Sequence, residues 1–441
     1  MTSPVLDLSL ETVHRFRPFE LVAAGFETPL PADAGPVAPY AAVELRLSGT
    51  DGDASAGLVT EDDQHVLVRW SGRRSVVTLE VRRAGRTRVL RRRTVRPGGP
   101  FGLAFALCEN QVTGLVDTGQ GWRPLLTERR KVAALVDLRA EEVLAAHRWS
   151  AEADALESSR AGVFGMTGLR DPRLVQHADG TAYSRDGRLY ATWTCAGLGF
   201  FPQAHWSVWS FDPGDPRDMR LESHLFSRRD GLVLGDHAGQ LVRDGDRWLV
   251  ATSSWGDFRP GRIHVRHAVT SADLLTGVHV LDTERTPLPT SRGSWDPALT
   301  RLGGVWNVAY VESPSQDPFV FHPALARTRS DDWTHQLEPV FAASRLRRTE
   351  GPVLVTVEGT AWLLSSDGKA RVYPVFDLHG RRAGHLDAPY LTNIPHPQLV
   401  EDPAGGWWML TFDGTPYARK VMGYGGHGDV VLMHTVDPSR S

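Results

Sequence analysis

The sequence predicts an all-β chain in which a five-bladed β-propeller follows an antiparallel β-sandwich. First, one pattern occurs five times: a polar or charged residue, usually followed by a small residue or proline, begins a short apolar strand, and a turn leads to a second strand that starts at or near an aromatic residue. Second, the heads of the copies, at positions 171, 236, 296, 350 and 396, lie 65, 60, 54 and 46 residues apart, a spacing typical of four-stranded blades. Third, 43 glycines, 29 prolines and 14 tryptophans among 441 residues favour tight turns and strands over helices.

The five copies define the blades in chain order. They pair residues 171–175 with 189–193, 236–242 with 248–251, 296–300 with 306–310, 349–355 with 361–366, and 396–400 with 408–412. Each pair reads as two antiparallel strands joined by a turn. Five copies therefore predict five blades.

The N-terminal part contains short apolar runs at residues 43–47, 65–70, 76–81 and 101–107, separated by glycine-rich turns. Such runs predict an antiparallel sandwich. A connecting region follows, in which residues 140–147 are suited to a short helix. We therefore predict a sandwich with its connector at residues 1–155 and the propeller at residues 156–441.

Charge and composition argue against nucleic acid and membranes as partners. Lysine and arginine total 49 against 52 aspartate and glutamate, and no stretch approaches the roughly 20 apolar residues of a membrane span. Eight arginines between positions 82 and 96 either form a binding patch or guard a sheet edge, and the absence of interleaved aromatics favours the edge. The N-terminus lacks the features of a secretory signal, so we expect a cytoplasmic protein. Cys108 and Cys195 fall in different predicted domains, so we expect no disulfide.

The heads of the repeats carry the candidate chemistry. The innermost strand of each blade lines the central channel, so the head residues are expected to converge at one mouth of it. A single Asp-Pro usually marks a turn, but four of the five heads are acidic, and crowded carboxylates raise one another's pKa. Glycoside hydrolysis needs one protonated and one ionised carboxyl group, and a third can keep the acid protonated. The heads are Asp171, Asp236 or His237, Asp296, Glu350 and His396.

On these motifs the chain resembles glycoside hydrolase family 43 and its clan of five-bladed propellers. The matching motifs are Arg170-Asp171-Pro172, Trp295-Asp296-Pro297, Thr349-Glu350-Gly351-Pro352 and His396. The resemblance implies that Asp171 is the general base, Asp296 a modulator of pKa and orientation, and Glu350 the general acid of an inverting hydrolase. It also implies arabinofuranosides or xylosides as substrates. The second copy, Gly235-Asp236-His237-Ala238-Gly239, departs from the family pattern, and the sandwich is loosely similar to concanavalin-like jelly rolls.

Six further residues are candidate substrate ligands: Asp236, His237, Trp255, Trp295, Arg371 and His396. The tryptophans suit either sugar stacking or packing between blades, and Arg371 suits either substrate or the solvent-exposed surface. His396 suits substrate, the core, or a structural cation in the channel, which the resemblance allows. No other metal and no cofactor are expected.

The expected partner is an oligosaccharide or glycoside, and the oligomeric state is left open. Two alternatives to a hydrolase remain. One is a propeller that binds glycans or proteins without catalysis, and the other is a transglycosylating or phosphorolytic relative.

Overall fold

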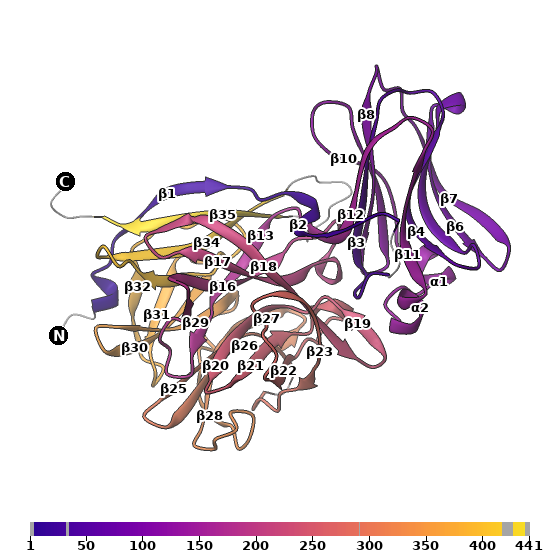
Figure 1. The fold of residues 1–441 in the computed structure, drawn as a ribbon. Helices are drawn as coiled ribbons and strands as arrows, with labels where there is room; N and C mark the ends of the chain where they lie inside the picture. Colours follow the sequence, from indigo (N-terminus) through magenta and orange to yellow (C-terminus); the bar gives the residue numbers. More distant parts are fainter. Residues whose placement is uncertain (1–3, 32–34, 291, 417–426, 437–441) are drawn as a thin grey trace.

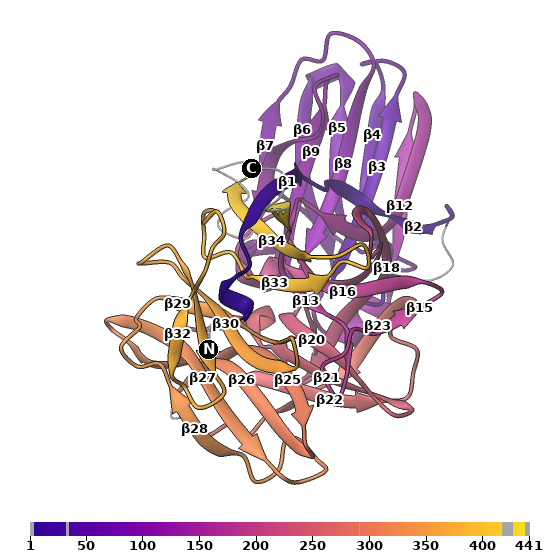
Figure 2. The same ribbon diagram turned by 90° about the vertical axis from the view of Figure 1, so that its left-hand side faces the viewer.

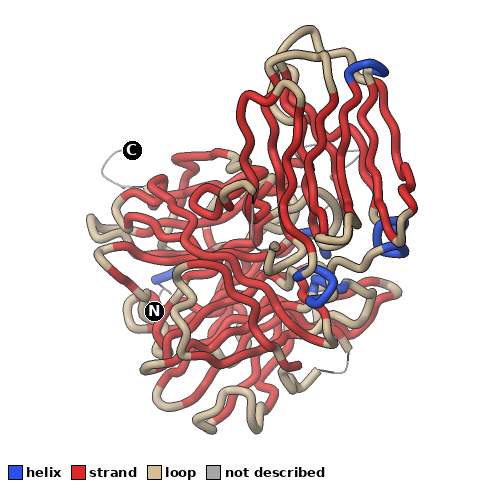
Figure 3. Tube along the Cα trace, turned by 45° about the vertical axis from the view of Figure 1, so that its right-hand side comes forward, coloured by secondary structure: helices blue, strands red, loops and turns tan. Residues whose placement is uncertain are grey.

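The structure of the chain is a computed structural model that describes residues 4–31, 35–290, 292–416 and 427–436. Strands dominate and the helices are short, as Figure 3 shows, so the predicted all-β fold is confirmed. Figure 1 shows an upright sandwich beside a broader ring of blades. The ends of the predicted domain ranges, residues 1–3 and 437–441, lie outside the described residues. No helix in the described ranges is long and apolar enough to cross a membrane.

Two antiparallel sheets form the sandwich, one in the order β10-β9-β8-β3-β12-β2 and the other in the order β11-β4-β5-β6-β7. All four apolar runs predicted as strands are strands. The elements are β2 (Glu20–Thr28), β3 (Tyr40–Leu47), β4 (Asp53–Thr60), β5 (His65–Ser71), the 3-10 turn η2 (Gly72–Arg74), β6 (Val76–Arg83), β7 (Arg86–Thr94), β8 (Phe101–Cys108), β9 (Gln111–Asp117), β10 (Arg123–Glu128), the helices α1 (Arg130–Leu135) and α2 (Glu141–Ala145), β11 (His147–Ala153) and β12 (Leu156–Met166).

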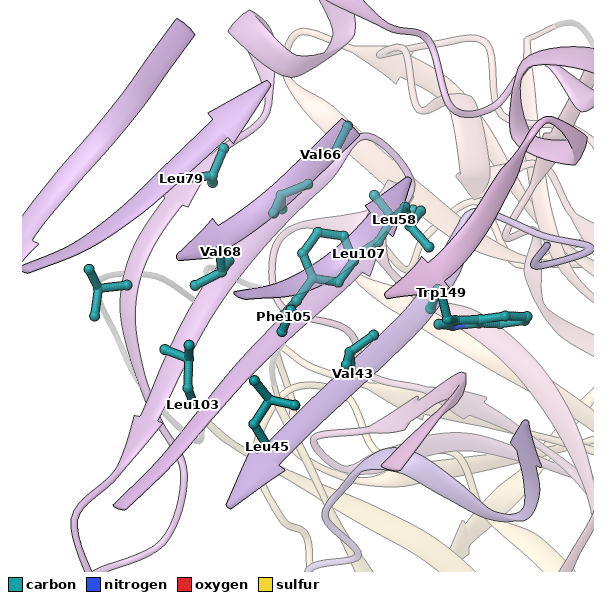
Figure 4. Close-up of a cluster of buried hydrophobic side chains, with 14 of the residues drawn as sticks. Val43, Leu45, Leu58, Val66, Val68, Leu79, Leu103, Phe105, Leu107 and Trp149 are labelled. Carbon is teal, nitrogen blue, oxygen red and sulfur yellow. The ribbon is translucent and has the colours of Figure 1, made fainter. Parts of the chain in front are cut away.

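The sandwich core is built from alternate residues of facing strands, because side chains two apart lie on one face of a strand. Figure 4 shows part of this buried cluster: Val43, Leu45, Leu58, Val66, Val68, Leu79, Leu103, Phe105, Leu107 and Trp149. The arginine-rich run ends in β7, which is the edge strand of the five-stranded sheet and is almost wholly exposed. Charged side chains on an exposed edge oppose pairing with another chain.

The propeller consists of five sheets in chain order. The first contains β13 (Leu169–Leu174), β15 (Ser184–Arg185), β16 (Arg188–Cys195), β17 (His205–Asp212), β18 (Asp215–Arg229), β19 (Leu232–Leu234) and β23 (Gly277–Asp282). The second contains β14 (Gln176–His177), β20 (His237–Asp244), β21 (Arg247–Ser253), β22 (Val265–Thr270) and β24 (Glu284–Arg285). The third contains β25 (Gly293–Leu302), β26 (Val305–Gln316), β27 (Phe319–Thr328) and β28 (Glu338–Ala342). The fourth contains β29 (Thr349–Val357), β30 (Thr360–Asp367), β31 (Tyr373–Asp377) and β32 (Arg382–Leu386), and the fifth contains β33 (Gln398–Glu401), β34 (Trp407–Pro416), β35 (His427–Thr435) and β1 (Leu10–Phe16).

Apolar clusters between neighbouring blades close the ring. Each of the five clusters contains side chains from two adjacent sheets, including the pair formed by the last and the first. Examples from each are Leu225 with Trp248, Leu249 with Trp306, Leu325 with Leu363, Trp362 with Met409, and Leu410 with Trp193. Three short 3-10 turns, η1 (Pro4–Leu6), η3 (Phe201–Gln203) and η4 (Trp255–Asp257), lie in the connections.

The strands place the domain boundary differently from the prediction at residue 155. Strand β1 pairs with β35 and completes the fifth blade, so the first strand of the chain belongs to the propeller. Figure 1 shows the two strands side by side, and in Figure 2 the indigo β1 runs beside the yellow end of the chain. Strand β12 lies between β3 and β2, so the sandwich extends to Met166. The physical reason is ring closure: without β1, the last blade would expose the unpaired edge of β35.

The sandwich and the propeller share a buried interface. The Tyr40 hydroxyl donates to the carbonyl oxygens of Pro202 at 2.6 Å and Ala204 at 3.1 Å. The Gln203 amide donates to Glu109 Oε2 at 3.2 Å. One apolar cluster contains strands of both domains. The two cysteines are buried, free and in different domains, as predicted.

Glutamine side chains connect the inner strands of neighbouring blades. Gln398 Oε1 accepts from the Leu174 amide at 3.0 Å, and Gln240 Oε1 accepts from the Leu299 amide at 2.7 Å. Gln176 Nε2 donates to the Leu299 carbonyl at 2.7 Å. These bonds satisfy buried backbone groups that have no strand neighbour on the channel side.

One carboxylate of β35 binds two arginines, one at the end of β1 and one just after it. Arg15 Nε and Arg17 Nε donate to Asp429 at 2.9 and 2.6 Å, and the Asp429 side chain is only 12% exposed. We expect Asp429→Ala to lower the free energy of unfolding by about 2 kcal/mol, because it removes hydrogen bonds to charged groups. Urea unfolding measures this change. Glu11→Ala is the control, since Glu11 is an exposed acidic residue on β1, the partner strand of β35, and equal midpoints for the two variants would contradict the prediction.

Candidate active site

A one-residue bulge recurs near the start of four inner strands. In each bulge, a segment that advances three residues along the inner strand lies opposite a segment that advances only two along its partner. The bulged segments are Arg170–Arg173 in β13, His237–Gln240 in β20, Trp295–Ala298 in β25 and Glu350–Val353 in β29. The bulged residue has a positive φ: 55° at Asp171, 53° at Ala238, 52° at Asp296 and 65° at Gly351. Consecutive side chains of a regular strand point to opposite faces, but a bulge re-aims one of them. Both residues of each of the pairs Arg170–Asp171, His237–Ala238 and Trp295–Asp296 therefore line the same cavity.

The bulges also show which residues of the four blades are equivalent, and these differ from the repeat heads that the sequence suggested. The counterpart of Asp171 and Asp296 in the second blade is Ala238, two residues after Asp236. In the fourth blade it is Gly351, one residue after Glu350. Glu350 therefore occupies the position of Arg170, and it still reaches the cavity because that position also faces inward.

The cavity has a volume of about 730 Å³ and brings together eight of the nine predicted residues. They come from all five blades and their connecting loops. They are Asp171, His237, Trp255, Trp295, Asp296, Glu350, Arg371 and His396.

Three carboxyl groups converge on this cavity: Asp171 and Asp296 are buried and Glu350 is half-buried. His396 Nε2 lies 3.5 Å from Asp296 Oδ2 and 3.8 Å from Asp171 Oδ1. The Gly351 amide donates to Asp296 Oδ2 at 3.1 Å, and Trp295 Nε1 donates to Glu350 Oε2 at 3.3 Å. Each carboxylate is thus fixed by groups from a neighbouring element.

The surroundings separate the pKa values of the three groups. Burial raises the pKa of Glu350 well above its usual value, and the negative charges of Asp296 and Asp171 raise it further. Burial raises the pKa of Asp296 to about 7, although the Arg173 guanidinium opposes the rise. Burial also raises the pKa of Asp171, but Arg170, at 3.3 Å, and Arg173 both favour its ionised form. Asp171 is therefore the group best suited to be ionised at neutral pH and Glu350 the one best suited to be protonated.

Asp236 does not line the cavity, contrary to the prediction that it binds substrate. It is fully buried, forms an ion pair with Arg229 and accepts from the Gly256 amide at 3.0 Å. It therefore holds the turn that carries Trp255. The prediction failed because the acidic residue and the cavity-facing position are offset by two residues in this blade.

His237 and the predicted tryptophans lie together on one side of the cavity. His237 Nδ1 lies 3.1 Å from the Gly235 carbonyl, so Nδ1 carries the proton and Nε2 is left as an acceptor. Burial lowers the pKa of His237 well below its usual value. The ring centroids of Trp255 and Trp295 are 5.7 Å apart. Five phenylalanines that the sequence analysis did not single out extend this aromatic wall: Phe200, Phe201, Phe258, Phe319 and Phe321.

Arginines also line the cavity. The guanidinium of the exposed Arg371 lies 5.3 Å from the Tyr390 ring centroid and donates to the Tyr390 carbonyl at 3.0 Å. Arg348, two residues before Glu350, also lines the cavity. Arg170 also lines the cavity and was not predicted, although its position directly before Asp171 in the sequence could have indicated it. The phenylalanines carried no such signal because they lie in separate turns and strands.

One group of metal-ligating residue types lies outside the cavity, at the interface between the domains. Cys195, His205 and His224 are fully buried, with His205 Nε2 2.9 Å from His224 Nδ1. Burial lowers the pKa of both histidines, that of His224 to about 3, and raises the pKa of the Cys195 thiol to about 12. The outer ring nitrogens have no hydrogen-bond partner in the described part of the chain, whereas metal-binding histidines need one. The group fits a neutral hydrogen-bonded histidine pair.

Position 351 requires glycine, because a larger residue would contact the His396 ring and would strain the backbone. A Cβ at this position would come 2.2 Å from Cδ2 of His396, and φ is 65°. We expect Gly351→Ala to lower the free energy of unfolding by more than the roughly 1–3 kcal/mol of a strained φ alone, because the His396 ring must also move. Chemical denaturation measures the loss.

The matched control is Gly359→Ala. Gly359 lies in the turn that ends the same strand, has φ of 74° and has open space where a Cβ would lie. It isolates the cost of backbone strain. Equal losses for the two variants would show that the His396 contact imposes no constraint.

Comparisons with known proteins add a likeness to solved structures. No protein-family model matches the chain, and no curated protein matches it. A family 43 (GH43_1) enzyme from Xanthomonas citri is 16% identical, with a TM-score of 0.42 over 59% of this chain and 87% of that one. A family 117 glycoside hydrolase from the marine bacterium Zobellia galactanivorans is 10% identical, with a TM-score of 0.44 over 62% and 87%. A family 43 β-xylosidase/α-arabinofuranosidase from a compost microbial metagenome, solved with xylotriose, is 15% identical, with a TM-score of 0.42 over 61% and 96%.

Proposed function

We propose that the chain is a glycoside hydrolase that acts on arabinofuranosides or xylosides with inversion of the anomeric centre. The observation that carries this proposal is the meeting of three carboxyl groups, the buried Asp171 and Asp296 and the half-buried Glu350, in one cavity of about 730 Å³. Carboxyl groups with separated pKa values are the arrangement that acid and base catalysis on a glycosidic bond requires.

The roles follow from the charges around each group. Asp171 lies beside two guanidinium groups, so it is the general base that takes a proton from water. Glu350 accepts one hydrogen bond from Trp295 and is repelled by two aspartates, so it holds the proton that the leaving oxygen receives. Asp296, bound to the Gly351 amide, raises the pKa of Glu350. Trp295 orients the acid and forms part of the wall.

The substrate class comes from the resemblance of the motifs, and the cavity is compatible with it. Aromatic rings of the wall bind the apolar faces of sugar rings. His237 Nε2 is an acceptor for a sugar hydroxyl, and the exposed Arg371 is a donor. Sugar binding and hydrolysis by these residues need no cofactor.

If Glu350 is the acid, Glu350→Gln should lose activity to an extent that depends on the leaving group of the substrate. Wild type should hydrolyse at least one of the α-L-arabinofuranosides, α-D-arabinofuranosides and β-D-xylosides, as 4-nitrophenyl glycosides and as oligosaccharides. Glu350→Gln should lose about 10²- to 10⁴-fold in kcat on oligosaccharides. The loss on 4-nitrophenyl glycosides should be smaller, because nitrophenolate leaves with little help from an acid, whereas Asp171→Asn should lose activity on both kinds of substrate.

Glu312→Gln is the control for this series, because Glu312 is a partly buried glutamate of β26 that binds Thr290 at 2.9 Å. It should keep wild-type activity. Equal rates for wild type and Glu350→Gln on oligosaccharides would remove Glu350 as the acid. Binding without hydrolysis by any variant would favour a binding propeller, and products that change with added phosphate would favour a phosphorolytic relative.

The pH profile tests the role of Asp296. The basic limb of kcat/KM follows loss of the Glu350 proton, and a negative charge on Asp296 delays that loss. Asp296→Asn removes the charge, so the pKa of Glu350 falls and the basic limb should move to lower pH, by about 1 unit. Glu312→Gln serves as the reference. If the basic limb of Asp296→Asn lies at the same pH as that of the reference, Asp296 does not raise the pKa of Glu350.

A further inference from the structure

Arg173 is a buried cation that enters the proposed mechanism only through its charge near Asp171. It lies on β13, two residues after Asp171, and is 1% exposed. Its Nη1 donates to the Pro172 carbonyl at 3.1 Å and contacts His396 Nδ1 at 3.3 Å. Nε and Nη2 have no hydrogen-bond partner among the described residues. Burying a charge is costly, so a cation here needs nearby negative groups.

The contact with Arg173 determines which nitrogen of His396 carries the proton. A guanidinium has only donors, so Nδ1 must be the acceptor. Burial and the charges of Arg173 and Arg170 lower the pKa of His396 well below its usual value, so the ring is neutral. The single proton is therefore on Nε2, the atom that faces Asp296 and Asp171.

The same residues do not fit a divalent cation in the channel, which the family resemblance allowed. Such an ion takes several oxygen ligands at about 2.3–2.6 Å, and a histidine that binds a metal must offer a free nitrogen. Here the guanidinium takes Nδ1, and a proton occupies Nε2. The positive charge of Arg173 would also repel a second cation.

We propose that Arg173 takes the place of a channel cation and is a positioning residue, which fixes His396 as a neutral donor that faces Asp171 and Asp296 together. This inference rests on the proposed hydrolysis for its functional part. Its structural part, the tautomer and the absence of a required ion, stands on the geometry alone. Arg173 touches no substrate in this scheme and acts through His396 and through its charge.

The titratable and charged groups around Arg173 come from every inner strand. Asp171 and Arg170 lie on β13, His237 on β20, Asp296 on β25 and Glu350 on β29, and His396 precedes β33. Both histidines are neutral, so the cations that face the carboxyl groups are Arg173 and Arg170 at the two aspartates and Arg348 at Glu350.

Two measurements on the wild-type protein test the structural part without any activity. Elemental analysis should find less than one divalent ion per chain after dialysis, and EDTA or added Ca²⁺ should leave the Tm unchanged. Nitrogen-15 NMR of histidine-labelled protein, assigned with His396→Gln, should show the His396 proton on Nε2. A stoichiometric ion whose removal lowers the Tm, or a proton on Nδ1, would overturn the inference.

Variants test the functional part. Arg173→Met should lower kcat/KM by about 10- to 100-fold, as loss of an orienting partner does. It should also move the acidic limb of the pH profile to higher pH, because losing the cation raises the pKa of Asp171. Arg173→Lys keeps the charge and should return the limb toward its wild-type position. If Arg173→Met does not fold, Arg173→Lys and the measurements on the wild-type protein still test the role of Arg173.

The control is Arg327→Met, since Arg327 on β27 binds Asn307 and the Leu378 carbonyl at 2.7 Å and lies outside the cavity wall. It should leave the acidic limb unchanged. An equal loss in both variants with no shift of the limb would show that Arg173 is only structural. If wild type hydrolyses no glycoside, the proposed function fails, while the ion and tautomer measurements still decide the role of Arg173.

Discussion

The bulge near the start of four inner strands is the constraint on which the site depends. It places two consecutive side chains in the cavity, so that Arg170 lies beside Asp171 and Trp295 beside Asp296. It also frees a backbone amide, and a side chain of the preceding blade accepts from it. Thr194 accepts from Ala238 at 3.1 Å, and Ser253 accepts from Asp296 at 2.9 Å. In the fourth blade the acceptor is the Asp296 carboxylate itself, so the bond that stabilises the bulge also fixes the modulator.

Ring closure gives these bulges fixed relative positions. Interblade apolar clusters join each blade to the next, and β1 joins the two ends of the chain by completing the fifth blade. Glutamine side chains also connect neighbouring blades directly, the fifth with the first through Gln398 and the second with the third through Gln176. Carboxyl groups that repel one another can be held together only by a frame of this rigidity, because separation would relieve the repulsion. The sandwich supports the same frame, since Tyr40 holds the loop that carries Phe201 of the aromatic wall.

Cations and neutral histidines complete the electrostatics of the cavity. Two arginines on β13 lie close to Asp171, whereas Glu350 receives one neutral hydrogen bond and the field of two aspartates. Three groups of one chemical type are thereby given different proton affinities. His396 and His237 stay neutral, so they orient groups through hydrogen bonds without adding charge.

The sequence by itself determined the strands, the number of blades and eight of the residues that line the cavity, because strand periodicity and the Asp-Pro and Glu-Gly-Pro heads are local signals. Only the tertiary structure decided the rest. Asp236 lies just before β20 and Ala238 lies within it, and only the pairing of β20 with β21 shows which of them matches Asp171. The positions of β1 and β12 depend on which strands lack a partner in the folded chain. Strand β1 completes the fifth blade, and β12 lies between β3 and β2 in the sandwich. Arg173 resembles any arginine in a strand, and its role arises because folding buries it against a histidine 223 residues away.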